Sequence, residues 1–166
     1  MYLRQAREAD IPNLAKWVGD IEVMKHVTMR TYTSEEESIW FREMKKNADE
    51  HVFFICLIEG GDLIGSCGIH EVRNPKTVGI GLFIGDKTQW GKGYGTEAVK
   101  LLLGHIRQEF EVSRAWLRVD TANRPAIRCY EKCGFKIYDR HKNPDRIFSN
   151  GEEYLMEFIF PGTGDK

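Results

Sequence analysis

Glycines set around a lysine form the stretch whose residue types most directly suggest chemistry. Residues 89–103 read QWGKGYGTEAVKLLL, in which Gly91, Gly93 and Gly95 surround Lys92 ahead of a helical pattern. A turn between a strand and a helix presents unpaired backbone N–H groups and the positive end of the helix dipole, and both attract anions. Glycine lacks the Cβ atom that would keep phosphate oxygens away from those groups. The stretch therefore predicts a phosphate-binding loop.

Two nucleotide-binding motifs compete for this loop. A P-loop needs a lysine followed by serine or threonine, but Lys92 is followed by Gly93, which excludes that motif. A dinucleotide-binding loop needs GxGxxG in the first strand–helix–strand unit, whereas the glycines here alternate and lie late in the chain. Asp120 would then bind the ribose, so NAD binding stays open as an alternative. A purely structural glycine turn also stays open.

The composition limits the other function classes. The 166 residues suit a single domain over 1–166, and 24 Lys+Arg against 25 Asp+Glu give a net charge of -1. That balance supplies no cationic field for nucleic acid or a membrane surface. The charged start of the chain and the absence of any apolar run of ~18 residues predict a soluble, cytoplasmic protein. The cysteines are expected to be reduced and to bind no metal: Cys56, Cys67, Cys129 and Cys133.

Hydrophobic patterns and turn residues predict the elements that must position the loop. Helices are expected from an Asp10 N-cap, from a Ser34–Glu37 capping box, over Thr96–Phe110 and from an Asn123 N-cap. Strands are expected at 2–5, on either side of a turn at 59–62, at 76–85, at 115–121, from 135 and at 153–160. The order β-α-α-β-β-β-α-β-α-β-β predicts an α/β (α+β mixed sheet) domain.

Two motifs, WGKGYGTEAV and NRPAIRCYEKCGF, resemble the GNAT acetyltransferase superfamily. Its phosphate-binding signature is Gln or Arg, two residues, Gly, one residue, then Gly or Ala; Gly93 and Gly95 match the small positions and Trp90 takes the first. A tryptophan there is usual in the RimJ/RimL-like branch. The opening LRQAREADIPNLAKW and the closing NGEEYLMEF are also similar to that branch, so the resemblance covers nearly the whole chain.

The resemblance implies a GNAT fold whose central twisted mixed sheet is split between the fourth and fifth strands, here 81–84 and 116–120. Acetyl-CoA would lie in the split, with no metal. The implied cofactor-binding residues are the strand-edge pair Phe83 and Ile84, the loop residues Trp90, Gly91, Lys92, Gly93, Tyr94, Gly95 and Thr96, and Asn123 beyond the next strand. One departure is GDKTQW before Gly91, one residue longer than the usual GPEYW, which leaves the contacts of 86–89 open.

Tyr130 matches the family tyrosine that protonates the departing CoA thiolate, and simple packing of this side chain is the alternative. A phenol with a pKa of about 10 suits that role only if the transfer is concerted or one pKa is shifted. The candidates for a general base are His70 and Glu71. Spermidine acetyltransferases, which YEKCGF resembles, often have a Glu near the position of Gly79, where this chain has none.

The sequence thus predicts acetyl-CoA-dependent N-acetylation of a primary amine, with a protein N-terminal α-amine favoured by the RimJ/RimL-like branch. A polyamine or aminoglycoside acceptor, and a non-catalytic acyl-CoA-binding protein, are the alternatives. The acidic triplet 35–37 has an explanation in the helix dipole, and cation binding by these carboxylates is the alternative. The acceptor pocket is expected from 24–37, with His26 and Tyr32, and from 140–152. The oligomeric state stays open, a homodimer included.

Overall fold

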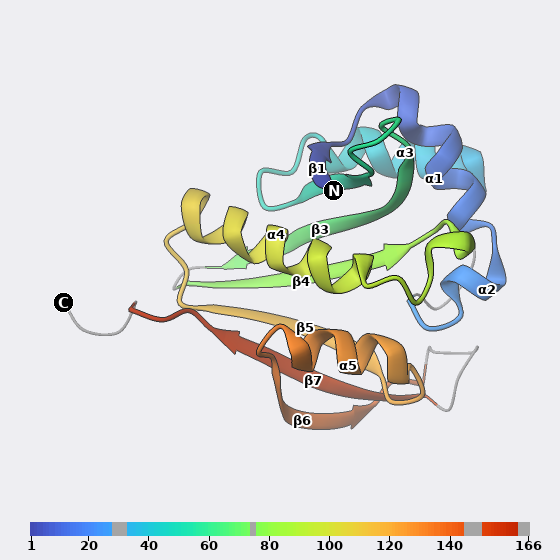
Figure 1. The fold of residues 1–166 in the computed structure, drawn as a ribbon. Helices are drawn as coiled ribbons and strands as arrows, with labels where there is room; N and C mark the ends of the chain where they lie inside the picture. Colours follow the sequence, from blue (N-terminus) through green and yellow to red (C-terminus); the bar gives the residue numbers. More distant parts are fainter. Residues whose placement is uncertain (28–32, 74–75, 145–150, 163–166) are drawn as a thin grey trace.

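The computed structural model describes residues 1–27, 33–73, 76–144 and 151–162, which form a seven-stranded sheet with helices on both faces (Figure 1). The strands are β1 Tyr2–Gln5, β2 His51–Cys56, β3 Leu63–Arg73, β4 Thr77–Ile84, β5 Arg114–Asp120, β6 Lys136–Lys142 and β7 Glu152–Ile159. The helices are α1 Ile11–Val18, α2 Ile21–Met24, α3 Ser34–Met44, α4 Tyr94–Glu109 and α5 Arg124–Lys132. The predicted mixed fold is confirmed, with α2 and two short 3₁₀ turns as additions.

The sheet splits between β4 and β5, as predicted. Its order is β1-β2-β3-β4-β5-β7-β6, and every neighbouring pair is antiparallel except β4 and β5. These two parallel strands pair at Thr77–Arg114, Val78–Ala115 and Gly79–Trp116, where their ladder ends. Both strands continue beyond that point, and their ribbons separate toward the C-terminal ends (Figure 1). The main chain at the end of β4 therefore faces a V-shaped opening whose vertex is the Gly79–Trp116 pair.

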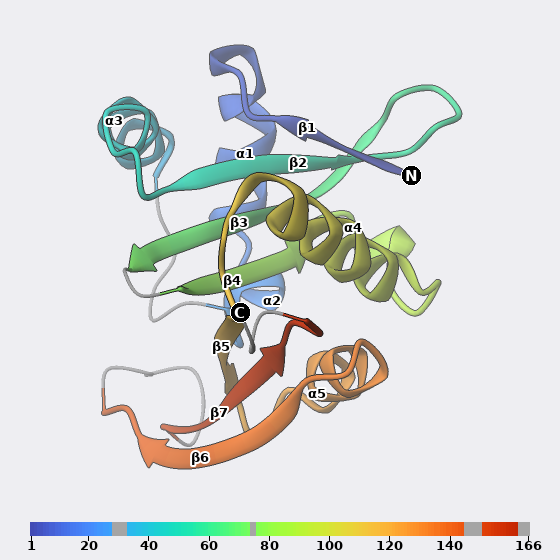
Figure 2. The same cartoon turned by 90° about the vertical axis from the view of Figure 1, so that its left-hand side faces the viewer.

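The two faces of the sheet carry separate apolar clusters. Residues of α4 and α5 pack on one face, and residues of α1 and α2 pack on the other, with α3 resting on α1 (Figure 2). Alternation along the strands assigns each side chain to a face: Val78 and Ile80 of β4 face α4, whereas Phe83 joins the α1 cluster. On β5, Leu117 and Val119 likewise face α4 and α5. Helix α4, which follows the glycine loop, and the helices α1–α3 thus lie on opposite faces of the sheet.

The start of α3 differs from the prediction by one residue. Thr33 is the N-cap, with an extended backbone (φ -86°, ψ 163°), and it forms the capping box with Glu36 rather than Ser34 with Glu37. Both pairs fit the Ser/Thr-x-x-Glu pattern, and the extended conformation of Thr33 decides between them. The Glu37 side chain therefore takes no part in the cap of α3. Helix α4 also begins at Tyr94, two residues before the predicted Thr96.

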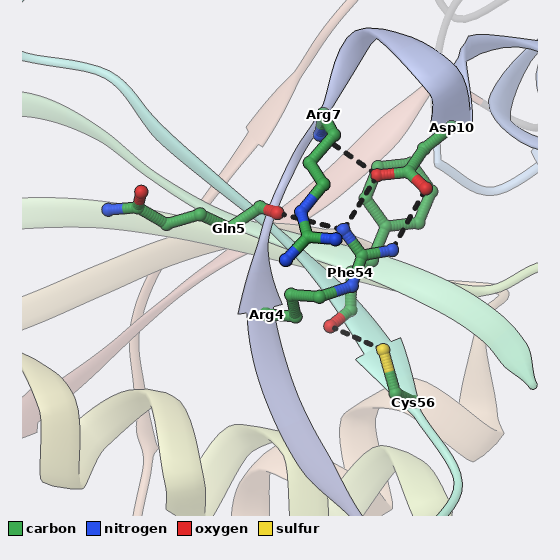
Figure 3. A network of polar contacts seen from close by, with 6 residues as sticks. All are labelled: Arg4, Gln5, Arg7, Asp10, Phe54 and Cys56. Atoms are coloured by element: carbon green, nitrogen blue, oxygen red, sulfur yellow. Dashed lines mark hydrogen bonds and ion pairs between the residues drawn. The ribbon is translucent and has the colours of Figure 1, made fainter. Parts of the chain in front are cut away.

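Asp10 takes the N-cap position of α1, as predicted, but its side chain makes no capping hydrogen bond, because its carboxylate binds Arg4 and the backbone of Arg7 instead (Figure 3). The Arg4 guanidinium donates to both Asp10 oxygens at 2.9 Å, and the backbone N–H of Arg7 donates to Oδ2 at 2.9 Å. Asp10 therefore joins β1 to the start of α1, and Pro12 in the first turn remains as the helix-start signal.

Candidate functional site

The glycine loop is built to expose its backbone. Gly91 and Gly93 have left-handed φ values of +77° and +87°, which favour glycine, and a Cβ placed on either would meet nothing within 4 Å. Gly93 is the N-cap of α4 and supplies no side chain to the helix terminus. The N–H groups of the first helical turn have no partner within the helix. The loop therefore offers an open cradle of donors at the positive end of α4, and a pyrophosphate fits that chemistry.

The longer entry to this loop is folded into a short 3₁₀ turn, Lys87–Gln89. Asp86 Oδ1 accepts hydrogen bonds from the backbone N–H and the hydroxyl of Thr88 at 2.9 Å and 2.7 Å. Lys87 Nζ lies 2.8 Å from the carboxylate of Asp20, the N-cap of α2. The indole Nε1 of Trp90 donates to the Ile84 carbonyl at 2.8 Å. The turn absorbs the additional residue and brings Trp90 to the end of β4, beside the predicted strand-edge residues.

Two of the predicted site residues belong to α5, Asn123 at its N-cap and Tyr130 near its end. Asn123 is the N-cap of α5, where its Oδ1 accepts from the Ala126 N–H at 3.2 Å, as expected. Tyr130 is 5% exposed, and its ring packs edge-on against Phe135 with centroids 5.8 Å apart. Burial raises the pKa of the Tyr130 phenol, so the hydroxyl stays protonated at all working pH values.

Sulfur contacts join the helix of Tyr130 to the glycine loop. The Thr96 hydroxyl lies 3.5 Å from Cys129 Sγ, and the Cys133 thiol lies 3.5 Å from the Thr96 carbonyl. A Cβ on Gly95 would be 3.5 Å from the same Cys129 sulfur. All four cysteines are free, and burial raises the pKa of Cys133 to about 11. Cys129 and Cys133 are therefore packing groups between α4 and α5.

A cavity of about 550 Å³ lies on the opposite face, between β3–β4 and the helices α1–α3. Its apolar wall comes from Leu14, Val18, Met24, Val27 and Trp40, and a Cβ on Gly81 would meet nothing within 4 Å there. Its polar side chains are three carboxylates, one imidazole and one hydroxyl: Glu36, Glu37, Glu50, His70 and Ser66. Glu36 and Glu37 lie within the range 24–37 expected around the acceptor, although the sequence favoured the helix dipole over cation binding for the acidic triplet. Glu50 is the carboxylate that the sequence did not single out.

Glu37 is the most buried of these carboxylates, with 6% of its surface exposed. Burial raises its pKa, and the neighbouring charge of Glu36 raises it further. The part of the chain that the structure describes gives the Glu37 carboxylate no cationic partner. A cationic ligand in the cavity would relieve both effects, since an opposite charge favours the ionised carboxylate.

The two candidates for a general base, His70 and Glu71, lie in different surroundings. His70 lines the cavity, whereas Glu71 points to the β5 side, where its carboxylate lies 3.8 Å from Arg118. Of the residues expected around the acceptor, His26 is described and bonds Asp120 through Nδ1 at 2.8 Å. Tyr32 and residues 145–150 lie outside the described residues.

Asp120 cannot serve the glycine loop as a ribose ligand. Its side chain is fully buried on the α1–α3 face, where it accepts from His26 and from the Ala122 N–H at 2.8 Å. The glycine loop opens on the other face. The dinucleotide alternative therefore loses the residue on which it depended.

Comparisons with known proteins agree with this geometry. The family described as "Acetyltransferase (GNAT) domain" matches residues 1–136. The uncharacterized N-acetyltransferase p20 of Bacillus licheniformis is 24% identical over 139 residues, which span 81% of this chain and 78% of the relative. Aminoglycoside N(6')-acetyltransferase type 1 of Klebsiella pneumoniae is 35% identical over 75 residues, which span 45% of this chain and 37% of the relative.

Solved structures share the fold over nearly the whole chain. A spermidine N-acetyltransferase from Vibrio cholerae, in complex with CoA and spermine, superposes with a TM-score of 0.85 at 18% identity and covers 95% of this chain and 94% of that one. An aminoglycoside acetyltransferase in complex with coenzyme A and kanamycin gives 0.80 at 23% identity, with coverage of 95% and 94%. Within the described ranges, none of the helices has the length and hydropathy to span a membrane.

Proposed function

The chain belongs to the GNAT family of acetyl-CoA-dependent N-acetyltransferases, and on that premise we propose that it acetylates a small amine carrying more than one positive charge, of the polyamine or aminoglycoside kind. The observation that carries this proposal is the cavity beside the split, where Glu36, Glu37 and Glu50 gather around an apolar wall. Carboxylates in a partly buried cavity attract cations more strongly than carboxylates in water do.

The acetyl-CoA side of the reaction uses the other face of the split. The N–H groups of Gly91 to Thr96 would bind the pyrophosphate, and the free edge of β4 at Phe83 and Ile84 would pair with the pantetheine amides. Asn123 borders the same region at the start of α5. The bound thioester supplies the activated acetyl group. An N–H group of β4 would stabilise the charge that develops on its oxygen.

Tyr130 is the proposed acid for the departing thiolate. Because burial raises its pKa, complete proton transfer to a free thiolate of pKa about 8.5 is unfavourable. Transfer in concert with cleavage of the C–S bond avoids that cost, since the proton then moves as the sulfur gains its charge. The buried phenol therefore acts late, and its protonated state is available at every working pH.

The protein N-terminal α-amine favoured by the sequence is less well supported than a small polycationic acceptor. A peptide amine brings one positive charge, whereas the cavity presents three carboxylates within about 550 Å³. Three of the similar proteins above are named for aminoglycoside or spermidine acetylation. The likeness is to those proteins, and their acceptors enter here as candidate substrates.

A thiol-release screen with acetyl-CoA tests the proposal. The acceptors are spermidine, spermine, kanamycin and a peptide with a free N-terminus and no lysine. Turnover with a polyamine or an aminoglycoside supports the proposal, and turnover with the peptide alone overturns the acceptor class. Acetyl-CoA binding without release for any amine would favour the non-catalytic acyl-CoA-binding alternative.

A further inference from the structure

The vertex of the β4–β5 split carries an imidazole. Gly79 is the last β4 residue of the parallel ladder, where it pairs with Trp116, and it also pairs with His70 across β3–β4. A Cβ on Gly79 would lie 2.4 Å from His70 Nε2, so the ring covers this glycine directly. The ring also packs edge-on against Trp116, with centroids 5.7 Å apart. His70 therefore reaches from β3 across β4 to β5 at the point where the strands part.

The same imidazole lines the cavity with the three carboxylates. Gly81, the next β4 position on this face, has open space beside it, so an amine held by those carboxylates has room next to the His70 ring. We propose that His70 is the general base that deprotonates the acceptor amine, an inference that rests on the proposed function. His70 was one of two candidates in the sequence, and its placement over Gly79 separates it from Glu71.

The proton balance of the step is complete. The acceptor enters as an ammonium ion, R–NH₃⁺, and gives one proton to Nε2 of neutral His70. The free amine forms the C–N bond, and the C–S bond breaks with its electron pair on sulfur. The thiolate takes the proton of Tyr130, and the second proton that the nitrogen loses as the amide forms replaces it on the phenol through solvent. The products are the acetylated amine, CoA thiol and one proton, which His70 returns to solvent.

The surroundings of His70 favour the form that this step needs. Burial lowers its pKa, Glu71 on its own strand opposes that effect, Arg118 of β5 adds to it, and Glu50 before β2 opposes it. Glu36 and Glu37 of α3 share the cavity. The ring is thus neutral at pH 7 and able to accept a proton, whereas a polyamine nitrogen of pKa about 10.4 is almost wholly protonated there.

The test compares His70→Gln with His105→Gln across a pH series. Glutamine keeps a polar side chain of similar length but accepts no proton at these pH values. His105 packs on Phe53 on the α4 face, away from the cavity, so its change is a matched control. We expect His70→Gln to lower kcat/KM for the acceptor about 100-fold at pH 7, with an unchanged KM for acetyl-CoA.

The pH dependence of the rate distinguishes a general base from a residue that only supports the structure. In the parent the rate should rise as pH passes the lowered pKa of His70; in His70→Gln the rise should move to the pKa of the acceptor amine, and added imidazole should restore part of the rate. A uniform loss at every pH would overturn the inference, as would a shifted profile in His26→Gln in place of His70→Gln.

A measurement without turnover tests the placement by itself. The Cε1–H resonance of His70 should shift on addition of acetyl-CoA, whereas that of His105 should not, because only His70 lies at the vertex of the split. An unmoved His70 resonance would overturn the assignment. If the parent acetylates no amine in the screen, the proposed function fails; if it turns over and His70→Gln keeps its rate and profile, only the general base is wrong.

Discussion

The two sides of the split are made from different parts of the chain. The glycine loop is almost entirely main chain: its donors are N–H groups, its shape comes from two left-handed glycines, and all of it lies within one short stretch. The acceptor cavity is made of side chains from α1, α2, α3, β2, β3 and β4. A main-chain site holds a group common to all acyl-CoA molecules, whereas a side-chain site can change its acceptor without disturbing the fold.

The largest expected effect breaks the main-chain side alone. Gly93→Glu places a side chain at a φ of +87° and a carboxylate where the pyrophosphate would lie. Losing two or more charge-assisted hydrogen bonds should weaken acetyl-CoA binding about 1,000-fold, measured by isothermal titration. The matched control is Gly104→Glu on the same helix, where an added Cβ meets nothing within 4 Å. Retained affinity in Gly93→Glu would remove the loop from the site.

The second effect tests Tyr130 of α5, the proposed acid. Tyr130→Phe removes the buried hydroxyl and keeps the ring that packs on Phe135. We expect kcat to fall about 100-fold while the Kd for acetyl-CoA stays the same, because the proton is needed only as the C–S bond breaks. Tyr138→Phe on β6, where the ring is 43% exposed, is the control. An unchanged kcat in Tyr130→Phe with a proven acceptor would make this tyrosine a packing residue.

The same contrast explains what the sequence could predict. The fold order and the glycine loop were accessible because they depend on periodicity and on the spacing of Gly91, Gly93 and Gly95, and the split followed from the resemblance to the GNAT superfamily. The range 24–37 was expected around the acceptor and part of it does line the cavity, but Glu50 was not expected there, because it joins the cavity lining only through tertiary packing. The capping of α3 was displaced by one residue since Thr33 and Ser34 both fit the motif. Asp10 takes the predicted N-cap position, but its carboxylate binds Arg4 instead of the N–H groups of the helix, and the sequence does not show that contact.

The third effect tests the side-chain half. Glu37→Gln removes a buried charge without changing the size of the side chain, and it should raise KM for a polycationic acceptor about 10-fold, as expected for one charged contact. Because burial raises the pKa of Glu37, the parent's KM should fall as pH rises through that pKa, and the variant should lack this dependence.

Glu59→Gln, in the exposed turn between β2 and β3, is the matched control for Glu37→Gln. Neither change should affect the Kd for acetyl-CoA, which belongs to the other face. An equal KM for the acceptor in the parent and in Glu37→Gln would show that the Glu37 carboxylate interacts with the helix dipole and does not bind the acceptor. The polycationic class would then lose its main support.

The smallest effect on activity comes from a residue outside both halves. Asp10→Asn should lower the free energy of unfolding by about 1 kcal/mol at pH 7, through loss of the Arg4 ion pair, with kcat and both binding constants unchanged. Burial alone would raise the Asp10 pKa, but Arg4 and the Arg7 N–H outweigh it and lower the pKa. This stabilisation is therefore present above the unfolded pKa of about 3.8 and is lost as pH falls through the folded value.

Urea unfolding at pH 7 and pH 3 measures that difference, with Asp49→Asn in an exposed turn as the control. The difference in stability between the parent and Asp10→Asn should be largest at pH 7 and smaller at pH 3, because the parent carboxyl takes up protons as pH falls toward its lowered pKa. A difference of the same size at both pH values would mean that the change acts through packing rather than charge. A fall in kcat at pH 7 would mean that the β1–α1 junction positions the cavity, which would join the side-chain half of the site to the stability of the α1–α3 face.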